Sequence, residues 1–495
     1  MENLLINNAK IERTIFREYD IRGTADVDPI ELSEGKPPRP INLTSDQAFL
    51  VGKAFGTHIR RKGGSRIVIG RDTRATSMSL AWGIISGLRS VGCDVYELGI
   101  CTTPMVYFAT QYLKVDGGIS ITGSHNPMWS NGIKMNVTST MSLVGAEISA
   151  LYDMIQASDF EKGAGRIIQV DIRAAYMDAV VAHVRPAQRH LKVVLDTGNA
   201  TGALVLPEIV RRLGYDVVTI NEEMIYPFPE GAPDPEQPSK MIKLAKKVVE
   251  LGADVGIAVD GDADRVGAVD GEGKKLESDL LLLLYARQVL ADNPGGEIIF
   301  DVKCTDLLFD EIKANGGIPL MWKTGHSVLK AKLTDEASHG KKAVLAGELS
   351  GHMFFRDRWY GFDDGVYSAC RLLEILSYST KTIDEMLENL PKSYSTRELA
   401  LECSDETKFR IVEELKNKLA KDGYKIIDID GVRVDFGNHE WGLVRPSNTQ
   451  PKLTARFSAV SKARLAEITD IVRKKLVEVG GVQLHELDEG LAEVE

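Results

Sequence analysis

The chain repeats one pattern of apolar and polar positions three times. Each repeat has an apolar run that ends in a polar turn, a helical stretch, a second apolar run opened by glycine, and a third apolar run that leads directly into a polar loop. Short apolar runs bounded by turn residues are typical of buried strands. We predict first strands at 66–72, 193–199 and 298–303, second strands at 92–96, 214–218 and 316–320, and third strands at 117–121, 255–259 and 343–345.

The alternation of strands and helices predicts mainly parallel sheets that are covered on both faces. The repeats are too long and irregular for a stacked solenoid, so we interpret them as three related domains. After them, helices at 405–421 and 463–479 flank short strands at 424–428, 432–436, 441–445 and 453–457. The predicted fold class is therefore α/β, with three related mixed α/β domains and a C-terminal α+β domain around a central cleft. The expected domains are 1–170, 171–275, 276–390 and 391–495, and the proline-rich stretch 24–44 is expected to be a surface loop.

The three loops that follow the third strands carry the candidate chemistry. If the domains are related, these loops lie at equivalent strand ends, and such ends converge only around one cleft. The first loop presents Ser124 with His125 beside it, and Asn126 before Pro127 is held out of the helical region. An ordinary turn with side-chain-to-backbone bonds accounts for the same residues.

The second loop places Asp260, Asp262 and Asp264 at alternate positions, followed by Arg265. Three clustered carboxylates repel one another unless a hard cation lies among them, so we expect Mg²⁺ here. An EF-hand calcium loop is excluded because its sixth position would be Arg265 and its twelfth Gly271, where glycine and glutamate are needed. A solvated acidic turn remains the alternative.

The third loop and a later one offer groups for a sugar phosphate. Glu348 and Ser350 suit vicinal hydroxyls, although Ser350 also fits a helix N-cap, and His352 could act as an acid or a base near neutral pH. The segment 445–449 combines an arginine fork with hydroxyl and amide donors, which suits either a phosphate clamp or a capped turn.

The composition and net charge argue against several classes of binding partner. The formal net charge of −11 argues against nucleic-acid and anionic-membrane partners, so an anionic substrate needs a local basic cluster. The five scattered cysteines indicate a reduced compartment, and no signal peptide or membrane span is evident, so we expect a cytoplasmic protein without an obligate protein partner.

These loops, in this order, together with the segment 16–23, resemble the signature of the α-D-phosphohexomutases, in particular the phosphomannomutase/phosphoglucomutase branch. The resemblance runs from Phe16 to beyond Arg445. It implies a phosphoserine loop, a metal loop, a sugar loop and a phosphate-binding loop. It further implies that Ser124 carries a phosphate, passes it to a hexose monophosphate and takes one back from a hexose 1,6-bisphosphate, which also serves as activator.

The resemblance implies a role for each candidate residue. The catalytic set is Ser124, His125, Lys134, Arg265, His352 and Arg22; the substrate-binding set is Tyr19, Lys303, His326, Glu348, Ser350, Arg445, Ser447, Asn448 and Thr449; the metal set is phosphorylated Ser124 with Asp260, Asp262 and Asp264.

The resemblance implies small-molecule hexose phosphates, of mannose or glucose, as substrates. The glucosamine branch usually has alanine before the serine and glutamine at the position of Leu349, where this chain departs from it. A phosphoglucosamine mutase, a non-catalytic sugar-phosphate-binding protein and a phosphatase remain as alternatives.

Overall fold

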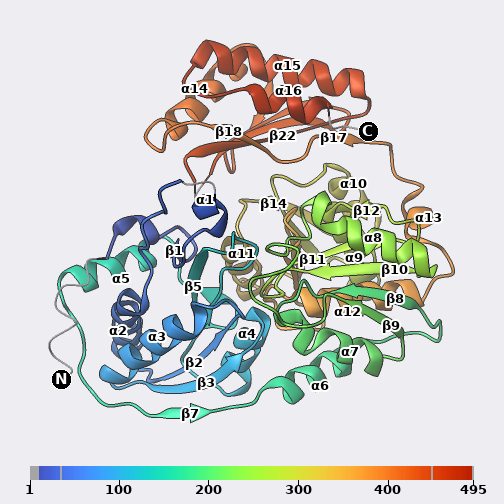
Figure 1. The fold of residues 1–495 in the computed structure, drawn as a ribbon. Helices are drawn as coiled ribbons and strands as arrows, with labels where there is room; N and C mark the ends of the chain where they lie inside the picture. Colours follow the sequence, from blue (N-terminus) through green and yellow to red (C-terminus); the bar gives the residue numbers. More distant parts are fainter. Residues whose placement is uncertain (1–10, 34–35, 448–449, 493–495) are drawn as a thin grey trace.

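Four consecutive parts of the chain each build one β-sheet (Figure 1). The computed structural model describes residues 11–33, 36–447 and 450–492. In Figure 1 the fourth unit lies above the other three, and strand β7 (Ile167–Gln169) runs along the bottom of the molecule between the first unit and the second. Within the described residues, no helix combines the length and the apolar character needed to cross a membrane.

The first unit contains a seven-stranded sheet. Its elements are η1 (Arg13–Ile15), β1 (Ile21–Thr24), α1 (Pro29–Ser33), α2 (Ser45–Arg61), β2 (Arg66–Arg71), α3 (Ser77–Ser90), β3 (Asp94–Ile100), α4 (Thr103–Tyr112), β4 (Gly117–Ile121), β5 (Ser130–Thr138), β6 (Met141–Ser142) and α5 (Ala146–Gln156). The strand order is β1-β5-β4-β2-β3-β7, with β6 on β5. Strands β4, β2, β3 and β7 are parallel, whereas β5 runs antiparallel to β4 and β1.

The second and third units repeat the centre of this arrangement. The second contains α6 (Arg173–His183), β8 (Lys192–Asp196), η2 (Thr201–Leu204), α7 (Leu206–Arg212), β9 (Asp216–Ile220), α8 (Pro238–Leu251), β10 (Val255–Val259), β11 (Val266–Asp270) and β12 (Lys275–Leu276). The third contains α9 (Ser278–Asp292), β13 (Glu297–Asp301), α10 (Leu307–Ala314), β14 (Ile318–Trp322), α11 (His326–Ser338), β15 (Ala343–Gly347), β16 (Met353–Phe355), α12 (Gly365–Ser377) and α13 (Ile383–Leu387). Their strand orders are β12-β11-β10-β8-β9 and β14-β13-β15-β16.

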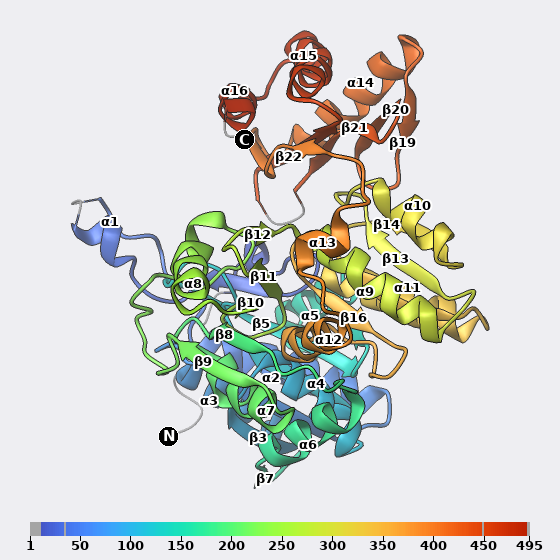
Figure 2. The ribbon, with the colours of Figure 1, turned by 90° about the vertical axis from the view of Figure 1, so that its right-hand side faces the viewer.

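The fourth unit is a six-stranded antiparallel sheet with three helices. Its elements are β17 (Tyr394–Ser395), β18 (Leu399–Glu402), α14 (Lys408–Lys421), β19 (Lys425–Ile427), β20 (Val432–Gly437), β21 (Glu440–Pro446), β22 (Lys452–Ala459), α15 (Lys462–Val479) and α16 (His485–Ala492). Figure 2 shows α15, α16 and α14 on the side of this sheet that faces away from the other units.

Each of the three repeated units returns its third parallel strand through a loop into an antiparallel neighbour. These pairs are β4 with β5, β10 with β11, and β15 with β16. The predicted strands and the equivalent positions of the three loops are therefore confirmed. The sequence analysis did not predict the antiparallel return strands, which hold the far end of every loop.

Two local expectations need correction or completion. The stretch 24–44 is not entirely a loop, because it contains the short helix α1. Pro29 is the first residue of that helix, a position where the missing N–H of proline costs no intrahelical bond. Helix α16 at the C-terminal end was not predicted. The domain boundaries given above stay predictions.

One apolar core joins the first three units, while most of the fourth packs by itself. Phe108, Tyr176 and Trp359 come from different units and lie together, with ring centroids of Phe108 and Trp359 6.4 Å apart. The fourth unit has its own cluster between its sheet and helices, although Trp441 and Leu443 of β21 belong to the shared core. Few apolar contacts therefore tie the fourth unit to the rest.

Candidate active site

The serine loop and the aspartate loop lie against each other at the ends of β4 and β10. Ser124 has the positive backbone angle φ of 49°, which is uncommon for a residue other than glycine. Its hydroxyl donates to Asp260 Oδ2 at 2.7 Å and lies 3.1 Å from His125 Nδ1. A side chain at Gly261 would meet the carbonyl oxygen of Ser124 at 2.6 Å, so only glycine allows the two loops to approach this closely.

Asp260, Asp262 and Asp264 are buried, and one carboxylate oxygen from each lies within 4.8 Å of the others. Lys134 of β5 donates to Asp262 at 2.7 Å and to Asp264 at 2.5 Å. Within the described chain, the other oxygens of these two residues, Asp262 Oδ1 and Asp264 Oδ1, are buried without a hydrogen bond. Buried carboxylate oxygens in that condition are costly, and they fit a hard divalent cation.

Burial and neighbouring charges shift the pKa values of the residues in this cluster in opposite directions. Burial, and then the neighbouring Asp262 and Asp264, raise the pKa of Asp260 well above its ordinary value. Burial also acts to raise the pKa of Asp264, but Lys134 and His352 outweigh it and hold that pKa well below the ordinary value. Burial alone would lower the pKa of Lys134. Asp262 and Asp264 outweigh burial and raise this pKa above its ordinary value, so the amine is charged.

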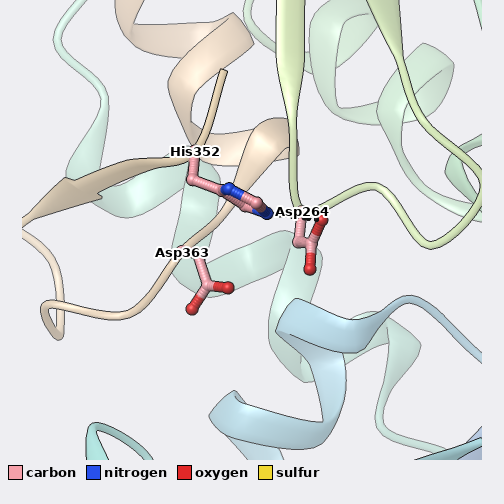
Figure 3. A group of neighbouring side chains, drawn as sticks. All are labelled: Asp264, His352 and Asp363. Carbon is pink, nitrogen blue, oxygen red and sulfur yellow. Dashed lines mark ion pairs between the residues drawn. The ribbon is translucent and has the colours of Figure 1, made fainter. Parts of the chain in front are cut away.

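His352 joins the aspartate loop to Glu348, and Figure 3 shows its ring beside Asp264. Its Nε2 lies 3.4 Å from Asp264 Oδ1, and its Nδ1 lies 2.9 Å from Glu348 Oε2. Burial would lower the pKa of His352, but these carboxylates raise it to about 9. Burial would raise the pKa of Glu348, whereas His352 and Lys303 lower it to about 2. Ser350 begins no helix; its hydroxyl lies 3.1 Å from His352 Nδ1, so the N-cap interpretation is wrong.

Asp363, the third residue in Figure 3, pairs with a second set of basic side chains. Its carboxylate pairs with His326 Nδ1 at 3.3 Å and with Lys330 Nζ at 2.9 Å. Lys330 is completely buried, and its ammonium lies 3.8 Å from the ring centroid of Tyr107 in the first unit. Burial lowers the pKa of His326 despite its carboxylate partner.

A cleft of about 530 Å³ opens over these loops. Seven lysine or arginine side chains and four carboxylates line it, so its local charge is opposite to that of the whole chain. Of the predicted site residues, Ser124, Lys134 and the three aspartates are buried beside it, and His125 connects Ser124 to the cleft. The lining includes Tyr19, Arg22, His125, Arg265, Lys303, His326, Glu348, Ser350, His352, Arg445 and Ser447.

The fourth unit closes one side of the cleft through polar contacts. Arg445 Nε donates to Asp430 at 2.9 Å, and the same carboxylate accepts from the backbone N–H of Thr324 in the third unit at 3.1 Å. Lys303 donates to Glu398 at 2.8 Å. Asn448 and Thr449, which were predicted to bind phosphate, lie outside the described residues.

The remaining predicted residues border the entrance. Tyr19 donates to the carbonyl of Thr324 at 3.1 Å, and Arg22 pairs with Asp20 at 2.6 Å. Arg265 extends toward Asp234 and Glu236 of its own unit, at 3.9 and 3.4 Å. The structure thus brings every described candidate residue into or beside one cleft.

Several polar residues of this region were missed by the sequence analysis. Glu236, Glu398, Lys452 and Arg39 line the cleft, yet each stands alone in a polar stretch without a distinctive pattern. No sequence pattern marks Thr103 either, although its hydroxyl donates to Asp262 at 2.6 Å. A usable signal did exist at Asp363 and Asp364, a pair of acidic residues directly before helix α12.

The chain matches, part by part, the family described as phosphoglucomutase/phosphomannomutase. Alpha/beta/alpha domain I matches residues 13–162, domain II residues 174–273, domain III residues 277–394, and the C-terminal domain residues 398–475. Together these matches cover most of the chain, which therefore belongs to the phosphoglucomutase/phosphomannomutase family.

Individual relatives are similar over nearly their whole length. The phosphomannomutase/phosphoglucomutase of Pseudomonas putida is 41% identical, covering 95% of this chain and 97% of the relative. The phosphoglucomutase of Neisseria gonorrhoeae is 39% identical, covering 93% and 96%. The crystal structure of a phosphoglucomutase/phosphomannomutase family protein from Burkholderia thailandensis has a TM-score of 0.85 at 38% identity, covering 95% of this chain and 98% of that one.

The buried pair of Lys330 and Asp363 yields a prediction about stability. We expect Lys330→Met to destabilise the protein by about 3–5 kcal/mol, because it leaves a buried carboxylate with less compensation. Lys330→Met combined with Asp363→Asn should recover much of that loss. Chemical denaturation checks both variants. The control is Lys332→Met on the same helix, which removes a partly exposed pair with Glu336 and should cost at most about 1 kcal/mol. Equal effects of Lys330→Met and Lys332→Met would contradict the prediction.

Proposed function

We propose that this protein interconverts hexose 1-phosphates and hexose 6-phosphates of mannose, glucose or both. Ser124 acts as the phosphoryl carrier, and a hexose 1,6-bisphosphate is the intermediate. One observation carries the proposal: the Ser124 hydroxyl bonds directly to Asp260 at the floor of a basic cleft. Family membership and the names of the relatives support the same reaction.

In the first half-reaction the bond from phosphorus to Ser124 Oγ breaks and a sugar hydroxyl oxygen forms the new P–O bond; the proton that this hydroxyl loses ends on Ser124 Oγ, which restores the serine hydroxyl. The second half-reaction runs the other way from the second phosphate of the bisphosphate, so Ser124 is phosphorylated again. Catalysis of this transfer requires in-line positioning and compensation of negative charge. Lys134 and Arg265 supply positive charge at the aspartate loop that Ser124 contacts, and His125 Nδ1 lies within hydrogen-bonding reach of the serine oxygen.

The aspartate loop fits Mg²⁺, with Asp260, Asp262 and Asp264 as protein ligands and an oxygen of phosphorylated Ser124 as a further one. The bound ion would offset negative charge on the transferring phosphoryl group. Asp262 Oδ1 and Asp264 Oδ1 support this assignment, because both are buried and accept no hydrogen bond from the described residues, and only the latter has an ion-pair partner there, His352 at 3.4 Å. Ser124, whose hydroxyl already touches Asp260, is placed to contribute the remaining ligand.

The rest of the cleft suits the other parts of the substrate. Glu348 and Ser350 offer acceptor and donor atoms for vicinal sugar hydroxyls. Arg445, Ser447 and Lys303 line the same cleft, and their positive charge and hydroxyl group suit the phosphate that is not being transferred. We assign His326 and Tyr19 to the sugar, because both line the cleft and their ring centroids lie 6.3 Å apart.

We expect Ser124→Ala to abolish mutase turnover, because no oxygen remains to carry the phosphoryl group. The measurement compares mannose 1-phosphate, glucose 1-phosphate and glucosamine 1-phosphate, each with catalytic hexose 1,6-bisphosphate. Intact mass of the wild-type protein should show a fraction heavier by one phosphate, mapped to Ser124. Ser149→Ala, on helix α5 of the same unit, is the control and should keep its activity. Full activity of Ser124→Ala, or turnover of glucosamine 1-phosphate alone, would overturn the proposal.

Removal of divalent cations should abolish turnover and lower the melting temperature. Both should return with Mg²⁺, because binding to the folded state alone stabilises it. In Asp262→Asn, Mg²⁺ should no longer raise the melting temperature, and kcat should fall much more than KM rises, since metal charge matters most in the transition state. Thermal denaturation with and without Mg²⁺ provides a readout that does not depend on turnover. Undiminished activity in excess chelator would exclude the metal.

Arg445→Ala should weaken the binding of glucose 1-phosphate and of glucose 6-phosphate to the same extent. The phosphate that is not transferred must occupy one clamp whichever carbon carries it, so both isomers lose the same contact, worth about 1.5–3 kcal/mol. KM for each isomer is the measurement, and phosphorus NMR should show more free bisphosphate. Arg410→Ala is the control, because this exposed arginine pairs with Glu414 on the helix of the same unit. A loss for one isomer only would exclude a shared clamp.

A further inference from the structure

The turn after β2 carries a buried arginine that no step above uses. Arg74 is 2% exposed, although arginine is rarely buried so completely in proteins. It follows the polar turn that the sequence analysis placed at the end of the first strand, without a role. In the structure this turn lies directly against the serine loop.

The guanidinium of Arg74 binds four backbone carbonyl groups of that loop. One terminal nitrogen donates to the carbonyls of Pro127 and Ser130 at 2.7 and 2.9 Å. The other donates to Ser124 at 2.9 Å and to Asn126 at 2.7 Å. Only arginine offers a planar fork of donors that can bind several acceptors in one plane.

Asp72, in the same turn as Arg74, also holds the serine loop in place. Its carboxylate lies 3.3 Å from Arg74 Nε and accepts from the backbone N–H of Gly123 at 3.0 Å. The backbone passes so close that a side chain at Gly123 would lie 2.3 Å from the central carbon of the guanidinium. The loop therefore wraps around Arg74 on one side and meets the aspartate loop at Gly261 on the other.

This arrangement explains how Ser124 is held at its positive φ. A non-glycine residue in the left-handed region costs free energy and persists only where its surroundings enforce it. Arg74 draws in the carbonyls on both sides of the turn, including that of Ser124 itself. With the backbone so fixed, the hydroxyl points at Asp260.

We propose that Arg74 is a positioning residue for the phosphoryl carrier. Its guanidinium binds the backbone carbonyls of the serine loop and so directs Ser124 Oγ toward the aspartate loop. The inference rests on the proposed function and deepens it. Within the described chain, Arg74 itself does not line the cleft, and none of its hydrogen bonds to the serine loop reaches Asp260, Asp262 or Asp264. Its effect is therefore transmitted through the backbone of the loop.

The test is Arg74→Lys, which keeps the charge but cannot bind four carbonyls in one plane. We expect kcat to fall about 100-fold, the cost of a small misplacement of the reacting group, with KM changed by less than about threefold. The amides of 123–130 should exchange hydrogen faster than in the wild type. The matched control is Arg371→Lys: Arg371 is equally buried, but it pairs with Asp357 in the third unit and should leave kcat unchanged.

A second variant covers the case in which Arg74→Lys does not fold. Asp72→Asn weakens the same support and should also lower kcat selectively. If Arg74→Lys or Asp72→Asn lowers the melting temperature as the Arg371→Lys control does but keeps kcat within about threefold of the wild type, the role is structural only and the proposal is wrong. Unchanged amide exchange at 123–130 overturns it as well. A wild-type protein without mutase activity would instead refute the proposed function, and the exchange measurement would still decide whether Arg74 holds the loop.

Discussion

The ion pairs of Lys134 with Asp262 and Asp264 are the constraint on which the rest of the site depends. Charges taken out of water cost several kcal/mol each, and the cost is offset only where opposite charges meet in good geometry. Lys134 comes from the first unit and the aspartates from the second, so neither unit can satisfy its charge alone. This requirement brings the serine loop against the aspartate loop and sets the distance between Ser124 and Asp260.

Charge balance extends outward from that pair across the third unit. His352 links Asp264 to Glu348, and Asp363 balances His326 and Lys330. Two ion pairs of buried arginines, Arg433 with Asp306 and Arg456 with Asp279, also join the fourth unit to the third. A further contact, Lys303 with Glu398, borders the cleft and involves groups that a substrate phosphate would also attract. Buried charge thus ties all four units together, and only part of the contact with the fourth unit competes with ligand.

The strands and loops that could be predicted from the sequence are those with a one-dimensional signal. Apolar runs ending at Ser124, Asp260 and Glu348 indicated the strand ends correctly, because burial on both faces of a parallel sheet leaves a continuous apolar run. Strand β5 was missed because its sequence, with Asn131, Lys134 and Asn136, looks polar; these side chains are buried only because neighbouring loops and helix α4 provide hydrogen-bond partners. Arg74 was missed for a related reason: its partners are backbone carbonyls, which leave no mark on the sequence.

The loop between a parallel strand and its antiparallel return strand occurs in all three repeated units, and both of its ends are fixed by the same sheet. Position and chemistry are thereby separated: the sheet determines where the loop lies, and the loop residues determine whether that place carries a serine hydroxyl, a set of aspartates or a glutamate. A scaffold of this kind can diversify. Copies of one unit can acquire different reactivity by exchange of a few loop residues, without a new fold and without loss of the common centre toward which all three loops point.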